Sequence, residues 1–206
     1  MFAAYVAKRI GLPISTLAVG TNKNDILTRF FESGEMRTDA VSPSIAPSMD
    51  IQISSNFERL LFDTYGCDAT RVIKTMTTFQ TTGVFKVSPD ILETMRQTFI
   101  GGRLDDDGIT QVIRDTYTRT GQLIDPHTAI ACAPHLLQAL PEDTAHVSLA
   151  CAHPAKFPNA VNGAVGVLPE LPDFLDDLFE RKEQFTVLEN DTSVVKAFVE
   201  ETLGAG

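Results

Sequence analysis

Short apolar runs alternate along this chain with segments whose apolar residues recur at helical spacing. Residues 14–20 are typical of a buried parallel strand, and they lead through a polar turn into a helical pattern over residues 26–34. Strands that alternate with helices indicate βαβ units. We therefore expect an α/β fold with helices on both faces of a largely parallel sheet.

The same alternation continues through the rest of the chain. A capping-box spacing of Ser55 and Glu58 predicts the start of a helix, and residues 34–48, rich in Ser and Pro, predict an exposed and mobile loop. Further helices are expected over residues 2–10, 69–79, 89–95, 107–121, 126–140, 155–165, 172–179 and 194–199, with Pro134 bending one of them, and extended segments over residues 83–87, 145–151 and 185–188.

The charge of the chain limits its partners. A net charge of -10 and a pI near 4.8 argue against binding to nucleic acid or to an anionic membrane surface, since both require clustered Lys and Arg. No apolar run approaches the length of a membrane span, and the N-terminal residues do not have the pattern of a signal peptide. We expect a soluble, cytoplasmic protein with neither nucleic acid nor membrane as a partner.

The cysteines indicate a reducing compartment and not a disulfide framework. There are three of them, Cys67, Cys132 and Cys151, an odd number spread over a long chain. Cys132 and Cys151, with His135 and His153, could in principle supply four zinc ligands, but their spacing is poor for a structural zinc site. We therefore predict no metal site.

Four motifs in order narrow the interpretation further. They are GLPISTLAVGTNKNDILTRFF, SPSMDIQISSNFERLLFD, DPHTAIA and CAHPAKFP. Together they resemble the C-terminal part of threonine synthase over nearly the whole chain. The resemblance implies a fold-type-II enzyme that uses pyridoxal phosphate to convert O-phosphohomoserine and water into threonine and phosphate, with residues 1–206 as its C-terminal α/β domain.

Two elements of that family's site have no counterpart here. The family's Schiff-base lysine stands in a Phe-Lys-Asp triplet, and the nearest match, Phe85-Lys86-Val87, departs from it at the third residue. The family's phosphate loop, Gly-Asn-Phe-Gly, would lie immediately before Phe2. We therefore expect no catalytic residue in this chain, and the missing N-terminal half of the enzyme, in cis or as a separate chain, as the partner that carries the lysine.

The Cys-Ala-His-Pro corner is the third element, and it is present. By resemblance Cys151 stands where the family commonly has a Thr that faces the pyridine nitrogen, and Ala152 and His153 form the cofactor wall beside it. Lys156 is a candidate substrate contact. Without the resemblance, Cys151 is more simply a small core residue, His153 a turn residue and Lys156 a solvated side chain.

Other candidate site residues come from two further motifs. Thr21, Asn22 and Asn24 follow the first strand at its carboxyl end, where ligands gather in parallel sheets, and are predicted to line the cofactor site. Asn56 and Arg59 are candidate substrate contacts. The simpler interpretation makes all five ordinary turn, cap or helix-surface residues.

A second hypothesis comes from a different class of function. The chain is then a non-catalytic remnant of the same fold that acts as a binding or scaffold subunit, through the surface where the N-terminal half would pack. Such a surface would be apolar and larger than monomers usually expose.

Overall fold

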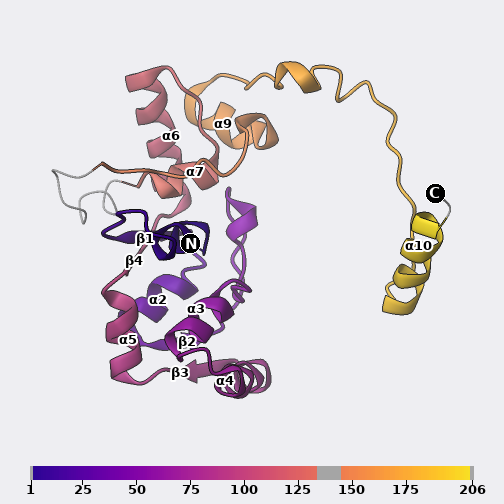
Figure 1. Ribbon diagram of the computed structural model, residues 1–206. Coiled ribbons are helices and arrows are strands. Elements are labelled where there is room, and N and C mark those ends of the chain that lie inside the picture. Colours follow the sequence, from indigo (N-terminus) through magenta and orange to yellow (C-terminus); the bar gives the residue numbers. More distant parts are fainter. Residues whose placement is uncertain (1, 134–144, 205–206) are drawn as a thin grey trace. The chain divides into compact units, whose positions relative to one another are not determined.

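The computed structural model describes residues 2–133 and 145–204 of the chain (Figure 1). The chain divides into two compact units, residues 1–170 and residues 171–206. Each unit is described here by itself.

Helices and short strands alternate through the first unit. Its helices are α1 (Phe2–Arg9), α2 (Ile26–Ser33), α3 (Phe57–Thr64), α4 (Ala69–Thr82), α5 (Pro89–Arg96), α6 (Asp106–Thr120), α7 (Pro126–Ala131) and α9 (Pro158–Val165), with 3₁₀ turns η1 (Pro47–Met49) and η2 (Pro154–Lys156). Its strands are β1 (Leu17–Thr21), β2 (Glu35–Arg37), β3 (Val84–Lys86) and β4 (Phe99–Arg103). The α/β class is confirmed.

The central sheet joins two strands that lie far apart in the sequence. β1 and β4 pair in parallel, with Leu17 opposite Phe99 and Thr21 opposite Arg103. α2 packs against both strands, and a Cβ on Gly101 would lie only 3.0 Å from Cα of Thr28. β4 therefore needs a glycine where the helix comes closest. The sequence analysis missed this strand, because two adjacent glycines interrupt its apolar pattern.

A second pair of strands lies partly in the segment that was predicted to be a loop. β2 pairs with β3 in antiparallel register, so residues 35–37 are extended and not part of a loop. Gly34 allows this reversal because it ends α2 in the left-handed conformation at φ 75°. The predicted loop is thereby shortened to the residues after Arg37, and its mobility stays a prediction.

The first unit has two clusters of buried apolar side chains, and the first cluster is rich in aromatic rings. The ring of Phe30 is fully buried and lies 4.7 Å from that of Phe57 and 5.6 Å from that of Phe31, measured between ring centroids. Phe31 in turn stacks on Phe99 of β4. α2 thus carries two neighbouring rings, of which one faces α3 and the other faces the sheet.

The second cluster joins α6, α7 and α9, which lie together in Figure 1. Its buried side chains include Ile109, Ile113, Ile130 and Ala46. Because Ala46 comes from the loop before η1, this cluster draws residues 45–49 toward α7.

The second unit contains less regular structure. It consists of the 3₁₀ turn η3 (Asp173–Leu175) and helix α10 (Thr192–Gly204), which is the predicted last helix. The prediction of a helix over residues 172–179 is wrong, because only Asp173–Leu175 are helical and they form a single 3₁₀ turn. A segment this short is marginal as a helix unless its apolar side chains are packed, and Phe174 is 78% exposed.

Two predicted strands are also wrong. Residues 145–151 and 185–188 are irregular, and neither pairs with another strand in the part of the chain that the structure describes. Alternating apolar residues suffice to suggest a strand, but a strand forms only where a neighbouring backbone supplies hydrogen-bond partners.

Helix starts and ends agree with the predictions in some places and not in others. Asp125 caps α7, Pro89 begins α5, and Gly121 ends α6, as predicted. The capping box is wrong, since α3 begins after Asn56 and no side chain caps it. The helix expected over residues 155–165 is divided into η2 and α9, because Pro158 starts a new helix. Pro134 lies outside the described residues.

No helix in the described ranges is long and apolar enough to cross a membrane.

The buried position of Phe30 generates a prediction about stability. Phe30→Ala should lower the free energy of unfolding by about 3–5 kcal/mol, because it removes a ring and leaves a cavity between α2 and α3. Urea denaturation followed by circular dichroism measures this loss. Phe62→Ala is the matched control, since Phe62 is also a phenylalanine of this unit, in α3, but is 39% exposed. Equal losses in the two variants would contradict the assignment of Phe30 to the core.

Candidate functional site

A fully buried carboxylate organises the start of α7. One oxygen of Asp125 accepts hydrogen bonds from the His127 amide at 2.9 Å and from His127 Nδ1 at 2.8 Å. The other accepts from the Thr128 hydroxyl, the Thr128 amide at 3.3 Å and the Ala152 amide at 3.2 Å. Asp125 therefore serves as helix cap and also binds a segment that lies 27 residues later.

The imidazole of His127 is held on three sides. Its Nε2 accepts a hydrogen bond from the Ser48 amide at 3.1 Å, and its ring centroid lies 4.6 Å from that of Phe157. An amide can only donate, so Nε2 has no proton in this arrangement and Nδ1–H donates to Asp125. His127 thereby connects the carboxylate to η1.

The corner that contains Cys151 is attached to the same helix. The Cys151 amide donates to the hydroxyl of Thr128 at 2.9 Å, and that hydroxyl donates to Asp125. The side chain of Cys151 is exposed, and its Sγ lies 3.5 Å from the Leu149 carbonyl oxygen. His153 accepts from the Ala155 amide at 3.2 Å and so caps η2, which is the structural role that a turn histidine would have.

The thiol of Cys151 is kept in its protonated form at neutral pH. Burial raises its pKa, and the negative charge of Asp125 raises it further. A protonated thiol is a weak hydrogen-bond donor. At this corner the chain therefore presents a neutral S–H group and not a thiolate.

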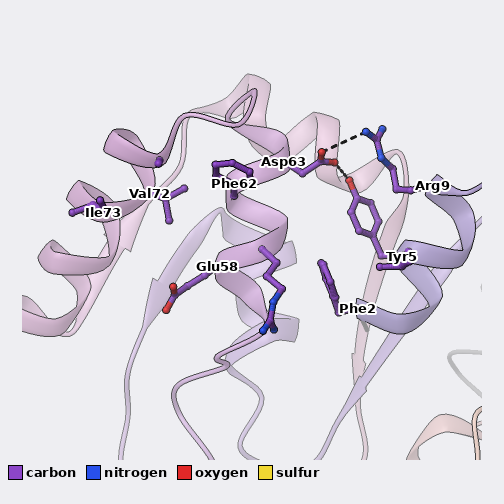
Figure 2. A pocket seen from close by; sticks show the side chains of 11 residues that line it. Phe2, Tyr5, Arg9, Glu58, Phe62, Asp63, Val72 and Ile73 are labelled. Atoms are coloured by element: carbon purple, nitrogen blue, oxygen red, sulfur yellow. Dashed lines mark hydrogen bonds and ion pairs between the residues drawn. The ribbon is translucent and has the colours of Figure 1, made fainter.

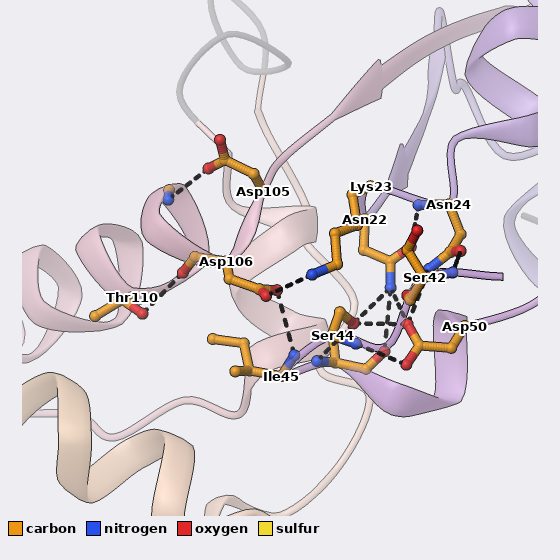
Figure 3. Close-up of polar contacts among 12 residues, drawn as sticks. Asn22, Lys23, Asn24, Ser42, Ser44, Ile45, Asp50, Asp105, Asp106 and Thr110 are labelled. Carbon is orange, nitrogen blue, oxygen red and sulfur yellow. Dashed lines mark hydrogen bonds and ion pairs between the residues drawn. The ribbon is translucent and has the colours of Figure 1, made fainter.

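The residues after β1 form a second polar cluster (Figure 3). The side-chain amide of Asn22 donates to Asp50 Oδ1 at 2.7 Å and to the Ser44 hydroxyl at 2.8 Å. Asn24 Nδ2 donates to Asp50 Oδ1 at 3.0 Å and to the Ser42 carbonyl at 2.8 Å. The two asparagines therefore attach residues 42–50 to the end of the strand.

Four further contacts complete this anchorage. Asp106 at the start of α6 accepts from Lys23 Nζ at 2.9 Å and from the Ile45 amide at 3.2 Å (Figure 3). The buried hydroxyl of Thr21 lies 2.8 Å from that of Thr28 and 3.1 Å from the Gly102 carbonyl oxygen, so it ties β1 to α2 and β4. The polar atoms of Thr21, Asn22 and Asn24 are thus all engaged within the protein.

The three candidate substrate residues lie on exposed surface. Arg59 donates to the side chain of Asn56, and its guanidinium carbon lies 5.4 Å from the centroid of the Phe2 ring. Lys156 is in η2, with its Nζ 5.8 Å from the centroid of Phe157. Lys156 follows the Cys151 corner in the sequence. Asn56 and Arg59 are hydrogen-bonded to each other.

Arg59 also lines an open groove between α1, α3 and α4, shown in Figure 2. The groove has a volume of about 540 Å³ and is lined mainly by apolar side chains, with Arg9, Glu58 and Asp63 at its polar positions. Asp63 accepts a hydrogen bond from the hydroxyl of Tyr5, which raises the pKa of Tyr5, already raised by burial, to about 12. None of the residues of the Cys151 corner lines this groove.

Within residues 2–133 and 145–204 no cluster of His, Cys, Asp and Glu could hold a metal ion. His135, one of the four zinc candidates, lies outside the described residues. Cys67, Cys132 and Cys151 are all free thiols.

The chain is similar to proteins of one kind in both sequence and structure. Residues 128–199 match the family described as "Threonine synthase, C-terminal". Threonine synthase of Pseudomonas aeruginosa is 43% identical over 97% of the chain, and that of Saccharomyces cerevisiae is 36% identical over 98%. The chain is thus similar to threonine synthases over nearly its whole length.

Solved structures of threonine synthase have the same fold as this chain. A pyridoxal-phosphate-bound threonine synthase from Brucella melitensis superposes with a TM-score of 0.85 at 47% identity and covers 97% of the chain. The yeast threonine synthase superposes with a TM-score of 0.81 at 34% identity. The chain spans 43% of the Brucella protein and 45% of the yeast protein, so it corresponds to less than half of either relative.

The sequence analysis found the corner but not what holds it. Asp125 was assigned only as a helix cap, and His127 and Thr128 were given no role. A signal was available, because an Asp-Pro-His-Thr sequence places four polar or turn-forming residues at the start of a helix that is otherwise apolar. Only the fold shows that these side chains reach residues 48, 151 and 152.

The environment of Asp125 predicts how stability depends on pH. Burial by itself raises the pKa of Asp125, but hydrogen bonds from Thr128, His127 and the amides of His127 and Ala152 outweigh it and hold the pKa below its usual range. The carboxylate therefore contributes stability above its unfolded pKa of about 4, and this contribution is lost as the pH falls toward the folded pKa.

Asp125→Asn should accordingly lower the free energy of unfolding at neutral pH by about 2 kcal/mol, because it weakens charge-assisted hydrogen bonds. Urea denaturation at a series of pH values measures the difference between the variant and the unmodified chain. The difference should shrink below about pH 4. A difference that stays constant down to acid pH would contradict the role of the carboxylate charge.

Proposed function

We propose that the chain is the C-terminal part of a pyridoxal-phosphate-dependent threonine synthase, a lyase that converts O-phosphohomoserine and water into threonine and phosphate. The homology to threonine synthases over 97% of the chain carries this proposal. The corner at Cys151 supports it, since its chemistry suits the cofactor that is named for the Brucella relative.

The chemistry of the Cys151 thiol is compatible with pyridoxal phosphate. When bound, pyridoxal phosphate acts as an electron sink for the reacting amino acid, and the protein supplies groups that orient its ring. Cys151 is exposed and protonated, so its S–H can donate to an unprotonated pyridine nitrogen. Ala152 and His153 form the wall beside it in this proposal, and Thr21, Asn22 and Asn24 shape the wall from the end of β1.

The substrate contacts are part of the same proposal. A substrate phosphate is dianionic over much of the neutral range, and cations and amide donors recognise it. Lys156 is exposed and follows the proposed cofactor wall, residues 151–153, in the sequence, and we propose that it contacts the substrate phosphate. Asn56 and Arg59 are proposed as a hydrogen-bonded pair of substrate contacts.

The isolated chain is proposed to be inactive. The family's lysine motif is absent from the sequence, and Schiff-base chemistry requires an amine that no other residue type replaces. Among the lysines of the first unit, Lys8 donates to two carbonyl oxygens and Lys23 is paired with Asp106. The partner we propose is the N-terminal half of the enzyme with its lysine and phosphate loop. The three free thiols support a cytoplasmic location.

A scaffold role is the second candidate. The groove between α1, α3 and α4 favours it, because it leaves apolar side chains such as Val6 and Ile73 open to solvent. A monomer rarely leaves such a surface uncovered without function. The same groove fits the first proposal if the N-terminal half covers it.

Complementation tests the proposed function. The chain is mixed with the separately purified N-terminal part of the Pseudomonas aeruginosa threonine synthase and pyridoxal phosphate, and phosphate release from O-phosphohomoserine is measured. We expect release only when both chains are present. A cofactor adduct that resists dilution after borohydride reduction should then map to the partner chain by mass spectrometry.

Cys151→Ala in the same mixture should lower the rate of phosphate release by about fivefold, since removing a weak hydrogen bond to the ring costs about 1 kcal/mol. Cys67→Ala is the matched control, because Cys67 is also exposed but lies outside the corner. A reduced adduct on a lysine of this chain alone would show that the nucleophile is not missing. A soluble complex without phosphate release would favour the scaffold role.

A further inference from the structure

We propose that Asp125 is a positioning residue that, through Thr128 and His127, holds the Cys151 corner and the turn at Ser48 in one arrangement. The inference rests on the proposed function, since it concerns the corner that would face the cofactor ring. Asp125 makes no contact with the reacting groups in this proposal and acts only through the residues that it binds.

The first observation is that Asp125 does more than cap a helix. The caps of α4 and α6, Asp68 and Asp105, each accept one hydrogen bond from an amide three residues later. Asp125 is fully buried and accepts from donors in two segments, one in α7 and one at Ala152. A helix start alone does not require the hydrogen bond from Ala152.

The second observation is that two successive amides attach the corner to the start of α7. Residues 145–151 pair with no strand in the described part of the chain, although Ser148 does donate to the Ala131 carbonyl. Two successive amides, those of Cys151 and Ala152, donate to Thr128 and Asp125 respectively. These two bonds fix the backbone on which the thiol is carried.

The third observation is that contacts also connect Asp125, through His127, to the turn at Ser48 and to the end of β1. His127 accepts from the Ser48 amide, and Asp50, two residues further on, holds both Asn22 and Asn24. α7 also packs against β1. A continuous series of contacts therefore runs from the corner through Asp125 to the carboxyl end of β1, where ligands bind in parallel sheets.

Amide hydrogen exchange measured by NMR on the full chain tests the inference without cofactor. In the unmodified chain the Cys151 and Ala152 amides should exchange at least about tenfold more slowly than exposed amides of the same segment. Thr128→Val keeps the shape of the side chain but removes the hydroxyl, and it should raise exchange at Cys151 by about tenfold. Thr128→Ser should restore the protection.

The control is Thr64→Val, because the hydroxyl of Thr64 bonds only to the Leu60 carbonyl oxygen within α3. It should leave exchange at Cys151 unchanged. Unprotected Cys151 and Ala152 amides in the unmodified chain would overturn the inference, even if no variant folds. Faster exchange spread evenly over α6 and α7 in Thr128→Val would overturn it too, since that result indicates general loss of stability.

Alkylation of Cys151 by iodoacetamide at a series of pH values, followed by peptide mass spectrometry, measures the pH midpoint of thiol reactivity. A purely structural role of Asp125 would leave this midpoint unchanged. Burial and the carboxylate of Asp125 raise the pKa of the thiol, the thiol of Cys132 raises it as well, and the hydroxyl of Thr128 lowers it. Asp125→Asn removes the negative charge, so the pH midpoint of alkylation at Cys151 should move lower. An unchanged midpoint would overturn the placement of Asp125 against the corner.

These measurements separate the inference from the proposed function. Slow exchange at Cys151 with no phosphate release in the two-chain mixture would support the positioning role and reject the proposed reaction. Phosphate release with an unprotected Cys151 amide would support the reaction and reject the positioning role.

Discussion

A carboxylate that is withdrawn completely from water must be given hydrogen bonds by the protein, and Asp125 meets this requirement with donors from two parts of the chain. The consequence is architectural. Because these bonds satisfy both oxygens, α7 cannot shift without breaking contact with the Cys151 corner. The neighbouring His127 adds the turn at Ser48 to the same unit of structure.

A second carboxylate has a comparable role on the other side. Asp50 accepts from Asn22, Asn24 and the Ser44 amide, and these contacts order a segment that has almost no regular secondary structure. Polar groups thus fix the loops of the first unit, whereas two apolar clusters, one rich in aromatic rings and one aliphatic, hold its helices and strands together. This division suits a ligand site, since loops placed by specific hydrogen bonds present a defined surface while the scaffold beneath them stays rigid.

Homology to threonine synthase gives these clusters a chemical interpretation. The corner presents a neutral thiol, whose pKa is raised first by burial and then by the negative charge of Asp125. The same carboxylate therefore helps to hold the backbone of the corner and contributes to the raised pKa of the thiol. The chain covers less than half of its relatives, and its exposed groove between α1, α3 and α4 is the type of surface that a larger assembly covers.

The sequence by itself determined the features that depend on neighbouring residues. The helical spacing of Phe30 and Phe31, the caps at Asp125 and Gly121, and the α/β class could all be predicted, because side-chain periodicity and backbone propensity act over a few residues. The Cys151 corner could be recognised from its motif. Whether its residues bind a cofactor stays a prediction.

Only the tertiary structure decided which distant segments meet. It showed that β4 pairs with β1 despite its two glycines, that residues 145–151 do not form a strand, and that Asp125 binds Ala152 as well as its own helix. The physical reason is the same in each case. A backbone amide or a buried carboxylate takes whichever partner the fold brings within hydrogen-bond distance, and no local pattern specifies a partner that lies tens of residues away.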